Sequence, residues 1–217
     1  MDTDRTRRRG TPDRRLKPEA RSPARRLVVA LTGASGIVYG VRLLERLRAH
    51  KDVETHLVLS RNAERVMGLE TDWTPARVRK LADRSYGMDD LAAPIASGSF
   101  PTMGMVVVPC SIKTLSAIAN CHAADLVSRA ADVTLKERRP LLLVVRETPL
   151  HAGQIRQLLL AAQSGATILP PVPAFYARPR SVADLVDQTV GKILDVLGFD
   201  EPSFRRWRGH TRGGGDP

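Results

Sequence analysis

The stretch Arg26-Leu-Val-Val-Ala-Leu-Thr32, followed by Gly33-Ala34-Ser35-Gly36, decides the fold class of this 217-residue chain. Its first part is a short run of leucine and β-branched residues, which is typical of a strand buried on both faces. The glycines predict a tight turn, and residues 37–49 beyond it repeat apolar side chains at helical spacing. A buried strand, a turn and an amphipathic helix in succession indicate the first unit of a parallel sheet covered by helices.

The rest of the chain continues this alternation, with no internal repeat and no second domain. Further strands are expected over residues 53–59, 105–109, 141–145 and 166–169, and helices over residues 62–70, 75–84, 113–120, 124–136, 151–163 and 181–197. The inward residues should be Ile155, Leu158, Leu159 and Ala162 in the helix over 151–163, and Val182, Leu185, Val186, Ile193, Leu194 and Leu197 in the last helix. Strands that alternate with helices predict an α/β domain with a mostly parallel sheet.

The formal net charge of +11 is concentrated near the two ends of the chain. Residues 1–26 carry a net charge of +6 and residues 201–217 a net charge of +2, which leaves +3 for the rest. These end segments are rich in Arg, Gly and Pro, and cannot bury enough apolar surface to fold. We therefore expect a disordered basic extension over residues 1–25, one domain over residues 26–200 and a tail over residues 201–217. Basic tails can bind RNA or anionic lipid. A solvated tail that aids solubility is the preferred interpretation, because that is the more common role of such charge.

Composition argues against several classes of protein. No apolar run approaches the roughly 20 residues needed to span a bilayer, and the basic N-terminus lacks the apolar segment of a secretory signal. The two cysteines, Cys110 and Cys121, have no CxxC spacing, which argues against a disulfide scaffold or a structural zinc site. The five histidines show no metal-ligand spacing. We therefore expect no membrane association, no bound metal and a cytoplasmic location.

Candidate functional residues follow the strands, because ligands of open parallel sheets bind beyond the carboxyl ends of the strands. The turn at Gly33–Gly36 has neither the dinucleotide nor the P-loop fingerprint. It is either a phosphate site, with free N–H groups at the start of the next helix, or an ordinary connection. Ser60 follows the second strand, where in isolation a helix cap is the preferred interpretation.

The strand over residues 105–109 is followed by Cys110-Ser-Ile-Lys-Thr114. Its hydroxyls, backbone amides and ammonium group could converge on a phosphate at a helix N-terminus, and a capped helix with an exposed lysine is the alternative. Cys110 has no partner base nearby in the sequence and is expected to be buried and inert.

Two later segments carry further candidates. Arg146 and Glu147 follow the strand over residues 141–145, and are either a surface ion pair or a cation and a titratable acid at a pocket floor. Their position at the end of a strand favours the second interpretation, a cation and an acid at a pocket floor. The proline-rich loop over residues 170–179 presents Phe175 and Tyr176, and an ordinary packed connection is the alternative there.

Together these motifs resemble those of one family. The pattern consists of GASG-x-x-YG at residues 33–40, LS at 59–60, ETD at 70–72, PCSIKT at 109–114, LKERRPLLLVVRETPL at 135–150, PPVPAFY at 170–176 and a lysine in the last helix. From about residue 27 to residue 198, the chain is similar to the UbiX/Pad1 flavin prenyltransferases. The order of several separate motifs makes this resemblance specific.

The resemblance implies a flavodoxin- or Rossmann-like three-layer α/β/α sandwich, with an FMN-binding flavoprotein domain over residues 26–200. It implies a large homo-oligomer, often a dodecamer, with part of the tail packed on a neighbouring subunit. It also implies that reduced FMN and dimethylallyl phosphate are substrates, without a metal. The resemblance further implies that the prenyl group joins N5 and C6 of the flavin and that UbiD-type decarboxylases use the product.

The resemblance also assigns roles to individual residues. The FMN site would comprise Gly33, Ala34, Ser35, Ser60, Ser111, Ile112, Lys113, Thr114 and Arg146. The catalytic residues would be Ser35, Glu70 and Glu147, and the donor site would comprise Lys136, Tyr176, Lys192 and Trp207. Trp207 would close the site from a neighbouring subunit.

One departure from the family pattern is Ile37-Val38. The family pattern has a small residue at the first of these two positions, so this change would narrow the pocket over the flavin. Two related functions remain as alternatives: an FMN-binding accessory subunit of an aromatic acid decarboxylase, and a flavin-dependent cysteine decarboxylase. The second relies on a catalytic histidine after the first helix, and neither His50 nor His56 has that context.

Overall fold

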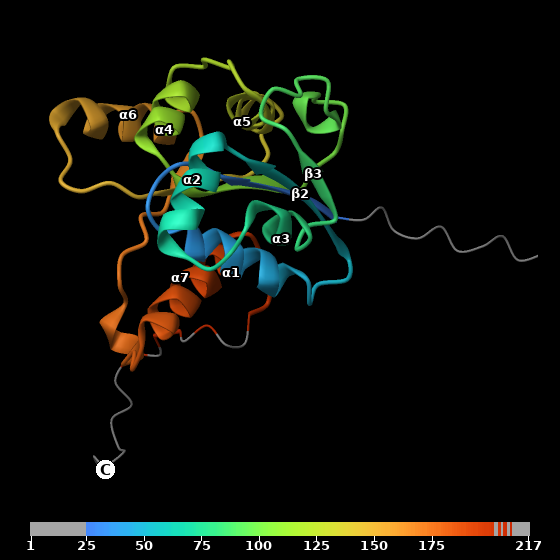
Figure 1. Cartoon of the computed structure of the whole chain (residues 1–217). Helices are drawn as coiled ribbons and strands as arrows, with labels where there is room; N and C mark the ends of the chain where they lie inside the picture. The colour runs from blue at the N-terminus through green and yellow to red at the C-terminus, as the bar shows by residue number, and fades with distance from the viewer. Residues whose placement is uncertain (1–24, 202–203, 205, 208, 210–217) are drawn as a thin grey trace, which may run out of the picture.

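The computed structural model describes residues 25–201, 204, 206, 207 and 209 (Figure 1). Six parallel strands form one sheet in the order β3-β2-β1-β4-β5-β6. The strands are β1 (Arg25–Leu31), β2 (Val53–Leu59), β3 (Arg84–Tyr86), β4 (Gly104–Cys110), β5 (Leu141–Val145) and β6 (Ala166–Ile168). Without the short edge strand β3, the order corresponds to the 2-1-3-4-5 order of flavodoxin-like sheets. The predicted α/β fold is therefore confirmed.

Helices cover both faces of the sheet (Figure 1). They are α1 (Ile37–Leu47), α2 (Arg61–Glu70), α3 (Pro75–Arg79), α4 (Ile112–Ala119), α5 (Leu126–Lys136), α6 (Ala152–Gln163) and α7 (Val182–Val196), with 3-10 turns η1 (Pro94–Ala96) and η2 (Phe175–Ala177). Successive strand residues point to opposite faces. Val29 accordingly packs in the core under α1, α2, α3 and α7, and Val28 packs in the core under α4, α5 and α6.

The predicted helix over residues 75–84 is wrong in its second half. Helix α3 ends at Arg79, and residues 84–86 form the edge strand β3. The carboxylate of Asp83 accepts hydrogen bonds from the backbone N–H of Thr55 (2.7 Å) and from its hydroxyl (2.8 Å). This contact holds the following residues beside β2. A three-residue polar strand is too short to show a periodicity, which is why the sequence pattern did not predict it.

The predicted inward faces of two helices are also partly wrong. In α6, Ile155 and Leu159 are more than half exposed and Ala162 is exposed, whereas Ala161 is buried. In α7, Val182 is exposed, because it lies in the first turn, ahead of the residues that pack on the sheet. Helix α6 covers the edge of the sheet and packs mainly on α4, so only a narrow row of its residues is buried.

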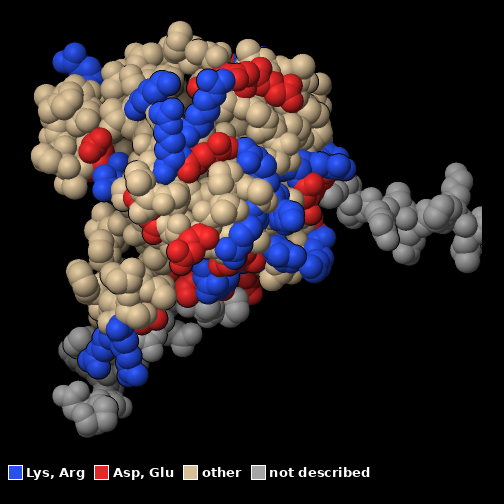
Figure 2. All heavy atoms as spheres, viewed as in Figure 1, with Lys and Arg blue, Asp and Glu red and all other residues tan. Residues whose placement is uncertain are grey.

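The described surface carries mixed charge. Figure 2 shows Lys and Arg in several groups, with Asp and Glu among them, on the face viewed in Figure 1. This distribution fits the modest net charge expected away from the ends. The predicted disordered extension lies outside the described residues except for Arg25, which begins β1. Among the described residues, no helix has the length and apolarity that a membrane span requires.

Candidate functional site

A cavity of about 390 Å³, here called the central cavity, lies at the carboxyl ends of β1, β2 and β4. Strand β1 has β2 on one side and β4 on the other, so the strand order reverses at this point. Ligands of open α/β sheets bind at such a switch point, and the volume falls within the roughly 300–1,000 Å³ of small-molecule sites. The lining residues are Gly33, Ser60, Arg61, Asn62, Met88, Asp89, Ser111, Lys113, Thr114, Ala117, Ala124, Asp125 and Ser128.

Three helices begin at the central cavity. Their N-cap residues Ser60, Ser111 and Asp125 each accept a hydrogen bond from the backbone N–H three positions on, at 3.0, 3.4 and 2.8 Å. Helix N-termini carry partial positive charge and unpaired N–H groups. The Asp125 carboxylate offsets this charge at α5, which leaves the starts of α2 and α4, together with Lys113, as the positive side of the cavity. This arrangement suits a phosphate group.

Buried contacts fix the loops that form the cavity. The hydroxyl of Thr32, which is only 1% exposed, donates to the carbonyl of Pro109 (2.8 Å) and accepts from the N–H of Ser111 (2.8 Å). At Gly33, a Cβ atom would lie 2.3 Å from Cβ of Asn62, so only glycine permits this approach of the two loops. Sequence reasoning did not single out Thr32 or Asn62, although Thr32 adjoins Gly33 and Asn62 lies two positions after Ser60.

Glu70 caps the first turn of α1. Its Oε2 accepts hydrogen bonds from the N–H groups of Gly36 (2.9 Å) and Ile37 (3.2 Å). The prediction that the start of this helix offers free N–H groups is therefore wrong for these two amides. The side chain of Ile37 is fully buried in the core, and neither it nor Val38 lines the central cavity. The expectation that these two residues narrow a flavin pocket therefore stays a prediction, and it does not concern the central cavity.

The predicted FMN residues fall into two groups. Five of them line the central cavity: Gly33, Ser60, Ser111, Lys113 and Thr114. The other four do not line it: Ala34 and Ser35 lie in the turn after β1, Ile112 begins α4 and Arg146 follows β5. Sequence reasoning missed Asp125, although Asp125-x-x-Ser128 has the spacing of a capping box.

Arg146 and Glu147 lie at the same edge of the sheet, because β5 pairs with β4. The N–H of Arg146 donates to the carbonyl of Cys110 (3.2 Å), and Oε1 of Glu147 accepts from the N–H of Thr148 (3.1 Å). The Arg146 side chain is exposed and that of Glu147 is half-buried. Cys110 is fully buried, and burial raises the pKa of its thiol to about 12. It is therefore inert, as predicted.

A second cavity of about 230 Å³, here called the lateral cavity, lies beyond the carboxyl end of β6. Its lining residues are Leu169, Pro170, Val172, Ala174, Tyr176, Gln188, Thr189, Lys192 and Phe204. Nε2 of Gln188 donates to the hydroxyl of Tyr176 (3.2 Å). The ring of Trp207 meets the ring of Tyr176 edge-on, with 6.0 Å between centroids. The structure thus brings together Tyr176, Lys192 and Trp207, all within one chain.

Gln188 was missed by sequence reasoning, although it lies one helical turn before Lys192. Phe204 was missed because nothing in the sequence of the tail shows where it returns to the domain.

Lys136 does not join the other predicted donor residues within one chain. It ends α5, just before the amino end of β5, whereas Tyr176 follows the carboxyl end of β6. Lys136 lies at the opposite edge of the sheet, where its Nζ donates to Oε1 of Glu137 (2.7 Å). The expectation that Lys136, Tyr176 and Lys192 form one site is therefore not met by a single copy of the chain.

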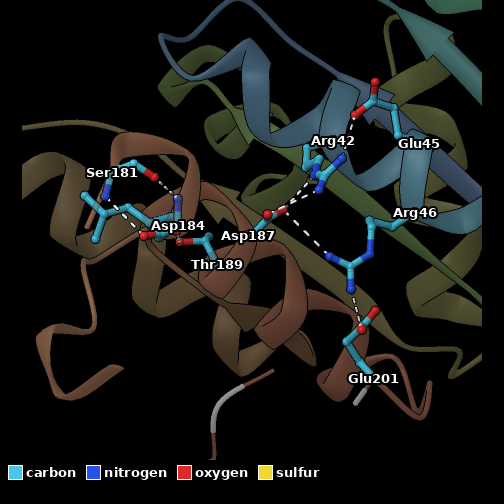
Figure 3. A network of polar contacts seen from close by, with 9 residues as sticks. Arg42, Glu45, Arg46, Ser181, Asp184, Asp187, Thr189 and Glu201 are labelled. Carbon is cyan, nitrogen blue, oxygen red and sulfur yellow. Dashed lines mark hydrogen bonds and ion pairs between the residues drawn. The ribbon is translucent and has the colours of Figure 1, made fainter. Parts of the chain in front are cut away.

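A larger hollow, of about 710 Å³, lies between α1, α7 and the loop after η2, away from these residues. Figure 3 shows that two of its arginines, Arg42 and Arg46, pair with carboxylates. Arg42 binds both carboxylate oxygens of Asp187 (2.6 and 3.2 Å), and Arg46 pairs with Asp187 (3.7 Å) and with Glu201. The hydrogen bond to Asp187 raises the pKa of Arg42. We interpret this hollow as part of the packing between α1 and α7, and not as the flavin site.

The part of the chain that the structure describes contains no group of three or more His, Cys, Asp or Glu side chains that could hold a metal ion.

Comparisons with known proteins match the chain to one family. Residues 15–194 match the family model described as Flavoprotein. The chain is 54% identical to the flavin prenyltransferase UbiX of Escherichia coli K12 over 85% of this chain and 99% of that protein.

Two solved structures are similar as well. One is the crystal structure of AnUbiX (PadA1) in complex with FMN and dimethylallyl pyrophosphate, with a TM-score of 0.84, 52% identity and coverage of 86% of this chain and 99% of that one. The other is a dodecameric FMN-dependent UbiX-like decarboxylase from Escherichia coli O157:H7, with a TM-score of 0.83, 47% identity and coverage of 85% and 100%.

Proposed function

Because the chain belongs to the flavoprotein family and, within it, to the flavin prenyltransferases, we propose that the central cavity binds FMN and that the lateral cavity binds the phosphate of a prenyl donor. The protein is a flavoprotein transferase that prenylates a flavin. The reaction that we propose joins the dimethylallyl group of dimethylallyl phosphate to N5 and C6 of reduced FMN, which supplies both reacting ring atoms.

The observation that carries this proposal is the positive side of the central cavity. The starts of α2 and α4 meet there, with the hydroxyls of Ser60, Ser111 and Thr114 and the ammonium group of Lys113. These groups would bind the FMN phosphate. The end of β5, with Arg146 and Glu147, lies farther along the same edge of the sheet and would adjoin the flavin ring.

The lateral cavity would hold the phosphate that leaves the donor. An allylic phosphate departs more readily when nearby groups neutralise its growing negative charge. The ammonium group of Lys192 and the hydroxyl of Tyr176 are suited to this role, and the hydrogen bond from Gln188 orients Tyr176. The ring of Trp207 contacts that of Tyr176 edge-on, and we propose that it helps to exclude water.

Acid-base chemistry would fall to Glu147. This carboxylate is half-buried at the end of β5, and we propose that it moves a proton between the flavin and the leaving phosphate. Ser35, in the turn after β1, would contact the flavin near its reacting atoms. Glu70 would act through the turn that it caps, because its carboxylate is bound to the N–H groups of Gly36 and Ile37.

We further propose a homo-oligomer, with a dodecamer as the expected size. The dodecameric relative supports it, and so does Lys136, which can contribute to a donor site only from another copy of the chain. A UbiD-type decarboxylase would use the product. A cytoplasmic location is proposed on the basis of the two cysteines, both of which are free.

Mass spectrometry of the flavin tests the activity directly. The protein is incubated anaerobically with reduced FMN and dimethylallyl phosphate, without added metal. We expect the flavin to gain one isoprene unit. Unchanged FMN that still co-purifies with the protein would contradict prenyl transfer and favour an FMN-carrying accessory subunit.

Two lysine variants test the placement of the two ligands. Lys192→Ala should raise the donor concentration needed for half-maximal rate about 10- to 100-fold, because one charge-assisted hydrogen bond is lost, and should leave FMN bound. The matched variant Lys113→Ala should instead weaken FMN binding, which is followed by flavin fluorescence. Equal loss of FMN in both variants would contradict the assignment of Lys192.

A further inference from the structure

The chain after α7 returns to the lateral cavity. Glu201 is buried and pairs with Arg46 of α1, which anchors the start of this segment (Figure 3). Phe204 packs on Gly191, where an added Cβ would lie 3.0 Å from Cβ of Phe204, and its ring lines the lateral cavity. The segment therefore brings its own side chains to the place where the donor phosphate is proposed to bind.

One carboxylate in this region bridges two cations. Oδ2 of Asp195 accepts from Nζ of Lys192 (3.0 Å), and Oδ1 of Asp195 pairs with Nη2 of Arg206 (2.5 Å). Both cations lie over the ring of Phe204, at 5.8 Å and 5.4 Å from its centroid. Lys192 and Arg206 are thus neighbours, although they are 14 positions apart in the sequence.

The two cations can leave this carboxylate more easily than the carboxylate can move. The side chains of Lys192 and Arg206 are 51% and 54% exposed, whereas that of Asp195 is 18% exposed. An exposed ion pair contributes little, because solvent screens it. A phosphate dianion offers more charge and more acceptor oxygens than a carboxylate, so it can compete for both cations.

We propose that Arg206 is a second cation of the donor-phosphate site, and that the donor phosphate replaces Asp195 as the common acceptor of Lys192 and Arg206. This inference rests on the proposed function, which places the donor phosphate at Lys192. Asp195 is a positioning residue, which holds both cations together until the donor arrives.

Tryptophan fluorescence measures this binding without turnover. The chain has two tryptophans, Trp73 and Trp207, so a full-length Trp73→Phe protein reports on Trp207 beside Tyr176. Oxidised FMN is kept bound, which fills the central cavity and prevents prenyl transfer. Titration with dimethylallyl phosphate, and separately with inorganic phosphate, should change the emission saturably.

Four variants in this background carry the test. Arg206→Gln should raise the apparent Kd for dimethylallyl phosphate about 10- to 100-fold, and Arg206→Lys should restore part of the affinity. Asp195→Asn should lower the Kd, because a competing carboxylate is removed. Arg178→Gln removes a charge from the nearby exposed turn and serves as the matched control, with a change of less than about twofold.

An unchanged Kd in Arg206→Gln overturns the proposal. So does an Asp195→Asn variant that binds more weakly than the parent, because Asp195 would then only support the fold. Lys192→Ala separates this proposal from the proposed function. If Lys192→Ala weakens binding and Arg206→Gln does not, only the present inference fails. If neither variant changes the Kd, the donor binds elsewhere, and both are wrong.

Discussion

Glu70 offers a test that separates a structural role from a chemical one. Its carboxylate accepts from two N–H groups at the start of α1, at Gly36 and Ile37. An acidic group at a helix N-terminus contributes about 0.3–1 kcal/mol through the helix dipole, and loss of a capping side chain costs about 0.5–2 kcal/mol. Glu70→Gln keeps an acceptor oxygen and loses only the charge, so we expect a loss of about 0.5 kcal/mol. Glu70→Ala loses both contributions, and we expect a loss of about 2 kcal/mol.

The assay is thermal unfolding of the FMN-free protein at one fixed concentration, combined with steady-state kinetics at saturating FMN. For a domain of this size, 1 kcal/mol corresponds to a shift in Tm of about 2–4 °C. We therefore expect Tm to fall by about 1–2 °C in Glu70→Gln and about 4–8 °C in Glu70→Ala. FMN affinity should fall several-fold in Glu70→Ala, because the turn that carries Gly33 loses its anchor, and kcat should change little. A hundredfold loss of kcat in Glu70→Gln at unchanged Tm would refute the capping role and make Glu70 part of the chemistry.

Two further predictions concern stability. A Cβ added at Gly40 would lie 2.5 Å from the carbonyl oxygen of Val108, whereas one at Gly68 would meet nothing within 4 Å. Gly40→Ala should lower the free energy of unfolding by about 1–3 kcal/mol or more, and Gly68→Ala should raise it by up to about 1 kcal/mol. Urea unfolding measures both changes. A change of the same sign in both variants would contradict the packing of α1 on β4. Burial lowers the pKa of His56. The cations Arg26 and Arg84 lower it further, whereas the carboxylates of Glu54 and Asp83 raise it. Nε2 of this ring is buried without a hydrogen-bond partner. Because the folded state binds the proton less readily, the stability contributed by His56 is fully present above about pH 6.5 and is lost as the pH falls through the folded pKa. Urea unfolding between pH 7.5 and 5.5 should show this loss, and His56→Gln should flatten it; a parent protein that gains stability on acidification would show the sign to be wrong.

The sequence predicted the elements whose residues repeat with a clear period. The strands over residues 53–59 and 141–145 were predicted with the observed bounds. Each of them ends in an apolar run of three residues or more that is followed by a polar residue, Ser60 or Arg146. The edge strand β3 was missed because a side chain 28 positions away, Thr55, holds Asp83 beside β2. Such a contact leaves no periodic trace in the local sequence.

The candidate site was predictable where residues directly follow strands. Parallel topology brings all carboxyl ends of strands to one edge, so Ser60, Ser111 and Lys113 could be placed together from the sequence pattern alone. The lateral cavity was not predictable in this way. The resemblance named Tyr176 and Lys192, but not Gln188 or Phe204, which also line the cavity. Gln188 of α7 meets Tyr176 of the loop, and Phe204 of the tail packs on Gly191, and periodicity encodes neither contact.

The distance between the two cavities depends on how helix α1 packs against helix α7. Helix α1 begins at the turn that borders the central cavity, and α7 carries Lys192 of the lateral cavity. The side chain of Tyr39 in α1 interacts with that of Thr189, one turn before Lys192, and burial raises the pKa of Tyr39 despite this interaction. Arg42 adds a bidentate contact with Asp187 one turn farther along α1. Two contacts, one turn apart, fix both the spacing and the rotation of the helices. In the proposed placement of the two ligands, the distance from the flavin to the donor phosphate would therefore be set by side chains that touch neither ligand. The polar face of α1 would then contribute to the geometry of the site together with the residues that line the cavities.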